Sequence, residues 1–113
     1  MSSEINRTAL IVTPKQPFVD WLNALDPAGG LTFAEVHEDT TVFLLPDEGF
    51  QEDQEELLKG FWEEIFEQVL WEWYTDAADW PEDRTYEKFR QWFDVKFHTG
   101  VVDLGDDPIQ EIE

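Results

Sequence analysis

The chain of 113 residues has the length of a single domain, and its 27 acidic and 7 basic side chains give a formal net charge of −20 at pH 7. This charge excludes a free-standing protein that binds nucleic acid through phosphate contacts, and it disfavours docking on anionic membranes. Hydrophobic residues make up 42% of the chain, too many for a disordered acidic tail, and the absence of cysteine excludes disulfides and thiolate catalysis.

The first half of the chain predicts two strands and a helix between them. Arg7–Thr13 is a short apolar run rich in β-branched residues, which is typical of a buried strand. Residues 17–25 predict a helix, because apolar side chains recur there at positions i, i+3, i+4 and i+7. Leu31–Asp39 is ambiguous and favours a short helical turn, and Thr40–Leu45 predicts the second strand.

The clearest helical pattern covers residues 53–74, where apolar residues come in pairs every four positions. At about 100° per residue these pairs cover an arc of about 220°, whereas a helix on one sheet face needs little more than about 100°. We therefore expect this helix to be covered by the sheet and by either another helix or a second subunit. The width of the arc favours a homodimer that buries part of residues 57–74.

The last third of the chain predicts one more helix and one more strand. Thr85 is a good N-cap, and aromatic residues follow it at helical spacing as far as His98. Val101–Leu104 predicts a third strand, and the chain ends, about 1–5 and 106–113, are expected to fray. The whole predicts a single α+β domain with a small mixed three-stranded sheet and three helices packed mainly on one face. The first strand, helix and second strand would suit a parallel crossover.

Charge is unevenly spread along the sequence. Residues 47–83 sum to −13, whereas residues 84–98 sum to +2. Two interpretations stay open: an acidic solvated face partly neutralised by the basic segment, or a surface built to meet a cationic partner. The first residues lack the basic start and apolar stretch of a signal peptide, so we expect a cytoplasmic protein, and its compactness favours a bacterial source.

Two stretches carry a resemblance to a known group of proteins. They are Thr8–Leu22 (TALIVTPKQPFVDWL) and Trp80–Leu104, which contains WP, an arginine, FRQWFDVKFH and VVDL. Together they resemble a family of short acidic bacterial proteins of unknown function. The resemblance covers most of the chain and implies no activity, ligand or partner.

Catalytic and metal chemistry find little support in the sequence. Asp94 and His98 are spaced i, i+4 on the predicted helix, but two ligands are too few, and the position of His37 relative to them is open. Glu63 and Glu67 are expected to share one solvated face rather than two different environments. No nucleophile or phosphate-loop motif is present. We therefore expect no catalytic residue, no metal site and no cofactor.

Two features remain as binding hypotheses. Lys15 follows a strand and precedes a helix N-terminus, so it suits a phosphate or carboxylate, or is simply a solvated side chain in a rigid turn. Trp71 projects among Glu63, Glu64 and Glu67, either as an interface anchor with a charged rim or against the turn at 75–83.

The function that we expect is therefore non-catalytic. An acidic protein would dock on a basic surface of another protein, as an inhibitor or immunity-type partner or as a nucleic-acid mimic. The alternative is a small-molecule or anion-binding protein, or an enzyme, that uses the Lys15 loop.

Overall fold

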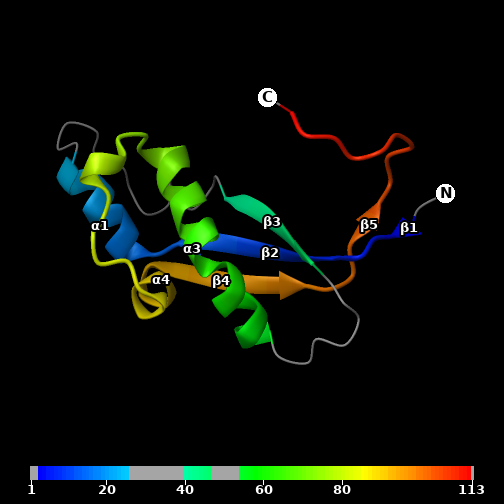
Figure 1. Ribbon diagram of the computed structural model, residues 1–113, viewed down its shortest axis with the longest axis horizontal. Helices are drawn as coiled ribbons and strands as arrows, with labels where there is room; N and C mark the ends of the chain where they lie inside the picture. Colours follow the sequence, from blue (N-terminus) through cyan, green and yellow to red (C-terminus); the bar gives the residue numbers. More distant parts are fainter. Residues whose placement is uncertain (1–2, 26–39, 47–53, 113) are drawn as a thin grey trace.

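The computed structural model describes residues 3–25, 40–46 and 54–112. The elements in chain order are β1 (Ser3–Glu4), β2 (Arg7–Pro14), α1 (Gln16–Leu25), β3 (Thr41–Pro46), α3 (Gln54–Trp73), the 3-10 turn η1 (Ala77–Asp79), α4 (Tyr86–Trp92), β4 (Phe93–His98) and β5 (Val102–Asp103) (Figure 1). The turn predicted within Leu31–Asp39 lies outside the described residues.

The main sheet has three strands in the order β3-β2-β4, and both of its pairings are antiparallel. The predicted α+β class, with a three-stranded sheet and three helices, is confirmed. The sheet is antiparallel rather than mixed, so the parallel crossover from β2 through α1 to β3 does not occur. Among the described residues, no helix is long and apolar enough to cross a membrane.

The helix predicted to run from Thr85 to His98 is wrong in its second half. Thr85 does cap α4, since its side chain accepts a hydrogen bond from the Lys88 amide at 3.1 Å. The helix ends at Trp92, however, and Phe93–His98 forms β4 along the edge of β2. Phe93 and Phe97 fit a period of two as well as helical spacing, and pairing with β2 satisfies the backbone of both strands.

The strand predicted at Val101–Leu104 is shorter than expected and belongs elsewhere. Only Val102 and Asp103 form a strand, β5, and it pairs with β1 instead of joining the main sheet. Ser3 and Glu4, in the segment expected to fray, are its partners. In the chain, β1 precedes β2 and β5 follows β4, and this small ribbon lies beyond the end of the main sheet (Figure 1).

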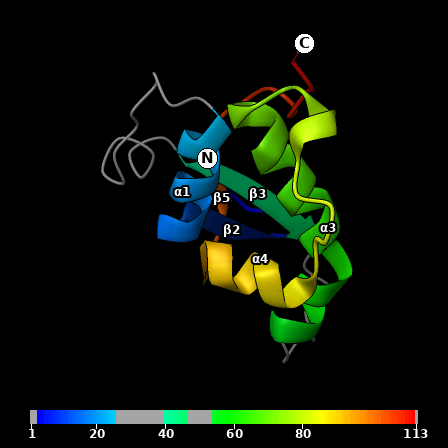
Figure 2. The same cartoon turned by 90° about the vertical axis from the view of Figure 1, so that its left-hand side faces the viewer.

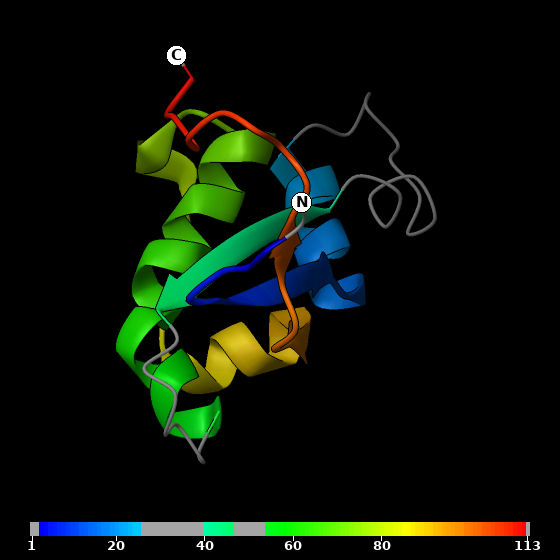
Figure 3. The ribbon, with the colours of Figure 1, turned by 90° about the vertical axis from the view of Figure 1, so that its right-hand side faces the viewer.

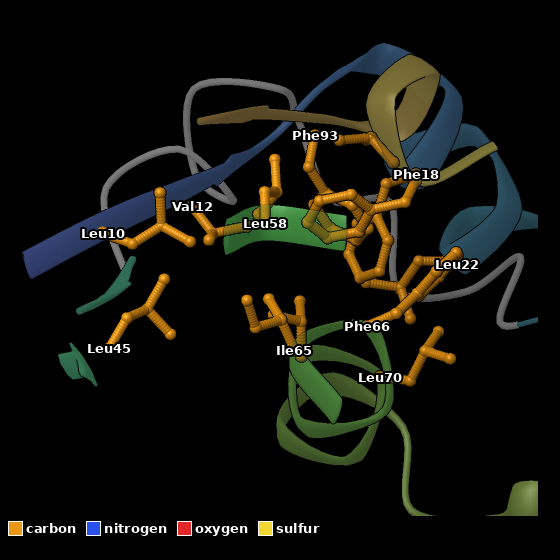
Figure 4. Packing of buried hydrophobic residues seen from close by; sticks show 13 residues of the cluster. Leu10, Val12, Phe18, Leu22, Leu45, Leu58, Ile65, Phe66, Leu70 and Phe93 are labelled. Atoms are coloured by element: carbon orange, nitrogen blue, oxygen red, sulfur yellow. The ribbon is translucent and has the colours of Figure 1, made fainter. Parts of the chain in front are cut away.

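The two faces of the sheet have different surroundings. Along β2, residues 8, 10, 12 and 14 are buried, and the residues between them are partly buried. Leu10, Val12, Leu45 and Phe93 face α1 and α3 across the core (Figure 4). The three helices surround this side of the sheet (Figure 2). Side chains of the other side, which we call the open face, come from all three strands: Arg7, Ala9, Ile11, Thr13, Val42, Leu44, Asp94, Lys96 and His98.

Most of the wide apolar arc of α3 is covered within the chain. Five of its residues are buried: Leu58, Ile65, Phe66, Val69 and Leu70. The Phe66 ring lies 5.3 Å from that of Phe93 and 5.9 Å from those of Phe89 and Trp92, between centroids. The expectation of cover by the sheet and a second helix is thus confirmed, with α4 as that helix. A homodimer is not needed to bury these positions and stays a prediction.

Candidate functional site

The four residues predicted to form a docking surface lie together on the outer side of α3. Glu63, Glu64, Glu67 and Trp71 are all exposed, and helical geometry places them within an arc of about 100°. We call these four residues the docking face. They lie there because the apolar positions of the same helix point toward the sheet, α1 and α4.

Trp71 differs from every other tryptophan of the chain. Its side chain is 54% exposed, whereas the other five, at positions 21, 62, 73, 80 and 92, pack against the core. Trp80, which belongs to the turn at 75–83, donates from its indole nitrogen to the Tyr74 carbonyl at 2.7 Å. Trp71 therefore presents a large apolar surface to solvent in an acidic setting.

The basic segment neutralises part of the acidic block, as one of the two interpretations predicted. Arg84 lies 3.5 Å from Glu67, and Arg90 lies 2.8 Å from Glu55. For Glu63 and Glu64 no ion pair is found among the described residues. The docking face therefore combines one carboxylate that is paired with Arg84 and two that are available to a cationic partner.

A hydrogen-bonded clasp joins the start of α3 to α4. The Tyr86 hydroxyl donates to Glu55 at 2.5 Å, and Arg90 donates to the same carboxylate at 2.8 Å. These bonds, that of Tyr86 first, hold the pKa of Glu55 below its usual value of 4.5. Burial, together with the bond to Glu55, raises the pKa of Tyr86 above 10.0. The clasp fixes the helix that carries the docking face.

Two depressions flank the docking face. A hollow of about 180 Å³ is lined by Trp62, Glu63, Glu67, Glu82 and Arg84. On the other side, a groove of about 430 Å³ runs between α3 and the edge strand β3, lined by Thr41, Phe43, Leu44, Leu45, Phe61, Glu64, Ile65 and Gln68. Sequence reasoning missed this groove. The sequence feature that indicates the groove is the position of Phe61 at the margin of the apolar arc of α3.

Lys15 is not part of the docking face and already has protein partners. Its ammonium group is 3.5 Å from the Arg90 carbonyl and 4.0 Å from the Asp94 carboxylate. Its backbone amide donates to the Trp92 carbonyl at 2.7 Å. These contacts attach the start of α1 to the junction of α4 and β4, and they place a carboxylate where an anionic ligand would have to lie.

The Asp94–His98 pair does not share a helix face, because both residues lie on strand β4. Four residues along a strand span about 13 Å, which is too far for one metal ion. In the described part of the chain, no group of three or more His, Cys, Asp or Glu side chains is placed to hold a metal. His37 lies outside the described residues.

Comparisons with known proteins add no functional assignment. No protein-family model, no curated protein and no solved structure matches the chain. The geometry of α3 and its surroundings is therefore the basis for a functional proposal.

Proposed function

We propose that this protein is a non-catalytic acidic binding protein that docks through α3 on a basic surface of another protein. The observation that carries the proposal is Trp71, more than half exposed on a helix side that also presents Glu63, Glu64 and Glu67. Tryptophan is strongly enriched among residues that dominate binding energy, and a rim of charges speeds encounter with an oppositely charged partner.

The two flanks of the docking face support the same proposal. Glu64 lines the groove beside β3, so one carboxylate borders both Trp71 and an apolar depression formed by Phe43 and Phe61. A basic partner could place an apolar side chain in that groove while its cations meet Glu63 and Glu64. Glu67 is held by Arg84, which gives the face one preoriented carboxylate.

Affinity capture identifies the partner. The tagged chain is incubated with a lysate of its source organism at about 50 mM and about 500 mM salt, since exposed charges are screened at the higher concentration. Mass spectrometry of the bound proteins is expected to show a basic protein that is lost at high salt. Capture of no basic protein at either concentration contradicts the proposal.

Variants then locate the contact on the purified partner. Glu63→Lys with Glu64→Lys is expected to slow association and weaken its salt dependence, because steering acts before contact. Glu4→Lys with Glu87→Lys changes the net charge equally at exposed positions away from the docking face and serves as the matched control. Equal slowing by both pairs would mean that only net charge matters.

Trp71→Ala is expected to raise the dissociation rate by about tenfold or more, because an anchor acts after encounter. Trp71→Phe keeps an aromatic ring and should raise the dissociation rate less than Trp71→Ala does. Circular dichroism checks that each variant folds. A folded Trp71→Ala chain that dissociates as slowly as the wild type rules out this anchor.

Competition separates the two forms of the proposal. A nucleic-acid mimic occupies the DNA-binding surface of its partner, so DNA should displace it in a titration followed by fluorescence anisotropy. An inhibitor of a toxin or nuclease should instead suppress the activity of the captured protein at stoichiometric concentration.

A further inference from the structure

The open face of the sheet is apolar along β3. Along β4 it carries Lys96 and His98 together with Asp94, whose carboxylate lies 4.0 Å from the Lys15 ammonium group. Ile11 lies between Val42 and Lys96, and Ala9 lies between Leu44 and His98 in the register of the three strands. Val42 is 55% exposed and Leu44 is 45% exposed, although both lie on strands. Unlike the core side, this face has no helix among the described residues to cover it.

The cations of this face differ from the other bases of the molecule. Five of the seven bases form ion pairs within the described residues: Lys15, Lys59, Arg84, Lys88 and Arg90. The other two, Arg7 and Lys96, have no carboxylate partner there, and both belong to the open face. Two cations without a carboxylate partner among the described residues favour an acidic group of a partner at this face.

The segment Leu104–Ile112 has the complementary composition. Leu104, Ile109 and Ile112 are exposed apolar residues, and Asp106, Asp107 and Glu111 supply negative charge. The segment has neither helix nor strand, and it turns back after β5, where the Gly105 amide donates to Asp103 at 2.8 Å. Figure 1 and Figure 3 both draw it on the β3 side of the sheet rather than across the open face.

We propose that the open face binds the segment Leu104–Ile112 of a second copy of this chain, and that two copies exchange these segments reciprocally. Nine extended residues span about 30 Å, enough to cross three strands spaced about 5 Å apart. The apolar residues of the segment would cover Ile11, Val42 and Leu44, while its acids meet Arg7 and Lys96. Two-fold symmetry makes each contact twice, which doubles the area that one segment buries. This surface shares only Leu44 with the groove beside the docking face, and the dimer does not depend on the proposed function.

Sedimentation equilibrium of the full chain at tens of micromolar tests the assembly. The wild type is expected to have twice the 13.3 kDa mass of one chain. Lys96→Glu should raise the dissociation constant by about tenfold or more, because it places an acid against the acidic segment. Lys59→Glu makes the same charge change on α3 and is the control that should leave the dimer intact.

A charge exchange between two chains decides which segment binds where. Lys96→Glu chains repel their own acidic segments, and chains with Asp106→Lys and Asp107→Lys repel their own basic faces, so each alone should be monomeric. Mixing the two should restore a dimer, since each face then meets a segment of opposite charge. This rescue requires the contact to join two copies.

Three results would overturn the proposal. A wild type that stays monomeric at hundreds of micromolar rules out a second copy as the occupant of the open face. The same result is expected if the segment folds onto the sheet of its own chain. A dimer that Lys96→Glu leaves unchanged uses another surface, such as α3. A mixture that stays monomeric, with both chains folded by circular dichroism, contradicts the pairing of segment and face.

Discussion

Along the contact between α3 and α4, basic side chains meet carboxylates, whereas on the open face of the sheet Arg7 and Lys96 have none among the described residues. The first region places its aromatic residues in the core and its acids outside. The second leaves Val42 and Leu44 in solvent. The fold therefore stabilises itself on one side of the sheet and exposes two different surfaces. The one on α3 is acidic, and the open face carries exposed apolar residues together with two cations that have no carboxylate partner among the described residues.

The largest expected loss of stability comes from the buried side of α3, and the exposed side should lose much less. Phe66→Ala removes a fully buried ring that contacts three other aromatic rings and should cost about 3–5 kcal/mol of unfolding free energy. Trp71→Ala on the exposed side should cost less than about 1 kcal/mol. Urea denaturation measures both. Equal losses would place Trp71 in the core.

Salt should stabilise the protein, because its clustered carboxylates repel one another. The melting temperature is expected to rise by a few degrees between about 20 mM and about 300 mM salt. Glu63→Gln with Glu64→Gln removes two carboxylates without an ion pair among the described residues and should reduce this rise. An unchanged melting temperature in the wild type would mean that the basic segment already balances the acidic block.

The clasp between α3 and α4 gives a smaller, pH-dependent effect. Tyr86→Phe should cost no more than about 1 kcal/mol, since it removes one partly exposed hydrogen bond to Glu55. The pKa of Glu55 is lowered in the fold, so its stabilising contribution is present above pH 4.5 and is lost as pH falls through the folded value. The pKa of Tyr86 is raised, so its contribution is present below pH 10.0 and is lost as pH rises through the folded value.

Thermal unfolding of the wild type and Tyr86→Phe from acidic to alkaline pH measures the difference between their free energies of unfolding. It should be constant between about pH 5 and pH 9 and shrink on either side. A difference that stays constant at pH 3 would show that the ionised form of Glu55 is not what Tyr86 stabilises.

The smallest effect is expected at Lys15. Lys15→Ala breaks a 4.0 Å contact with Asp94 between two partly exposed groups, which contributes about 0–1 kcal/mol. The backbone bond from Lys15 to Trp92 survives the substitution, so α1 should stay attached. A chain that loses affinity for inorganic phosphate on this change, measured by calorimetry, would instead support the anion-binding alternative.

The sequence by itself determined α1 and α3, because their apolar residues recur at helical spacing, and β2, because its short apolar run is rich in β-branched residues. It also placed the docking face, since residues off the apolar stripe of a long helix must point away from its core. Residues 93–98 were different. Their aromatic spacing fits a helix and a strand, and nothing local decides between them.

Tertiary structure decided that ambiguity because β2 has two edges to pair, and β4 supplies the second. The same pairing moved Asp94 and His98 from a supposed helix face to the open face of a sheet. It also decided which bases meet carboxylates, since Arg84 and Arg90 reach Glu67 and Glu55 only when α4 packs beside α3. Burial and ion pairing depend on residues far apart in the chain, whereas periodicity is local, and only the local part can be taken from a single sequence.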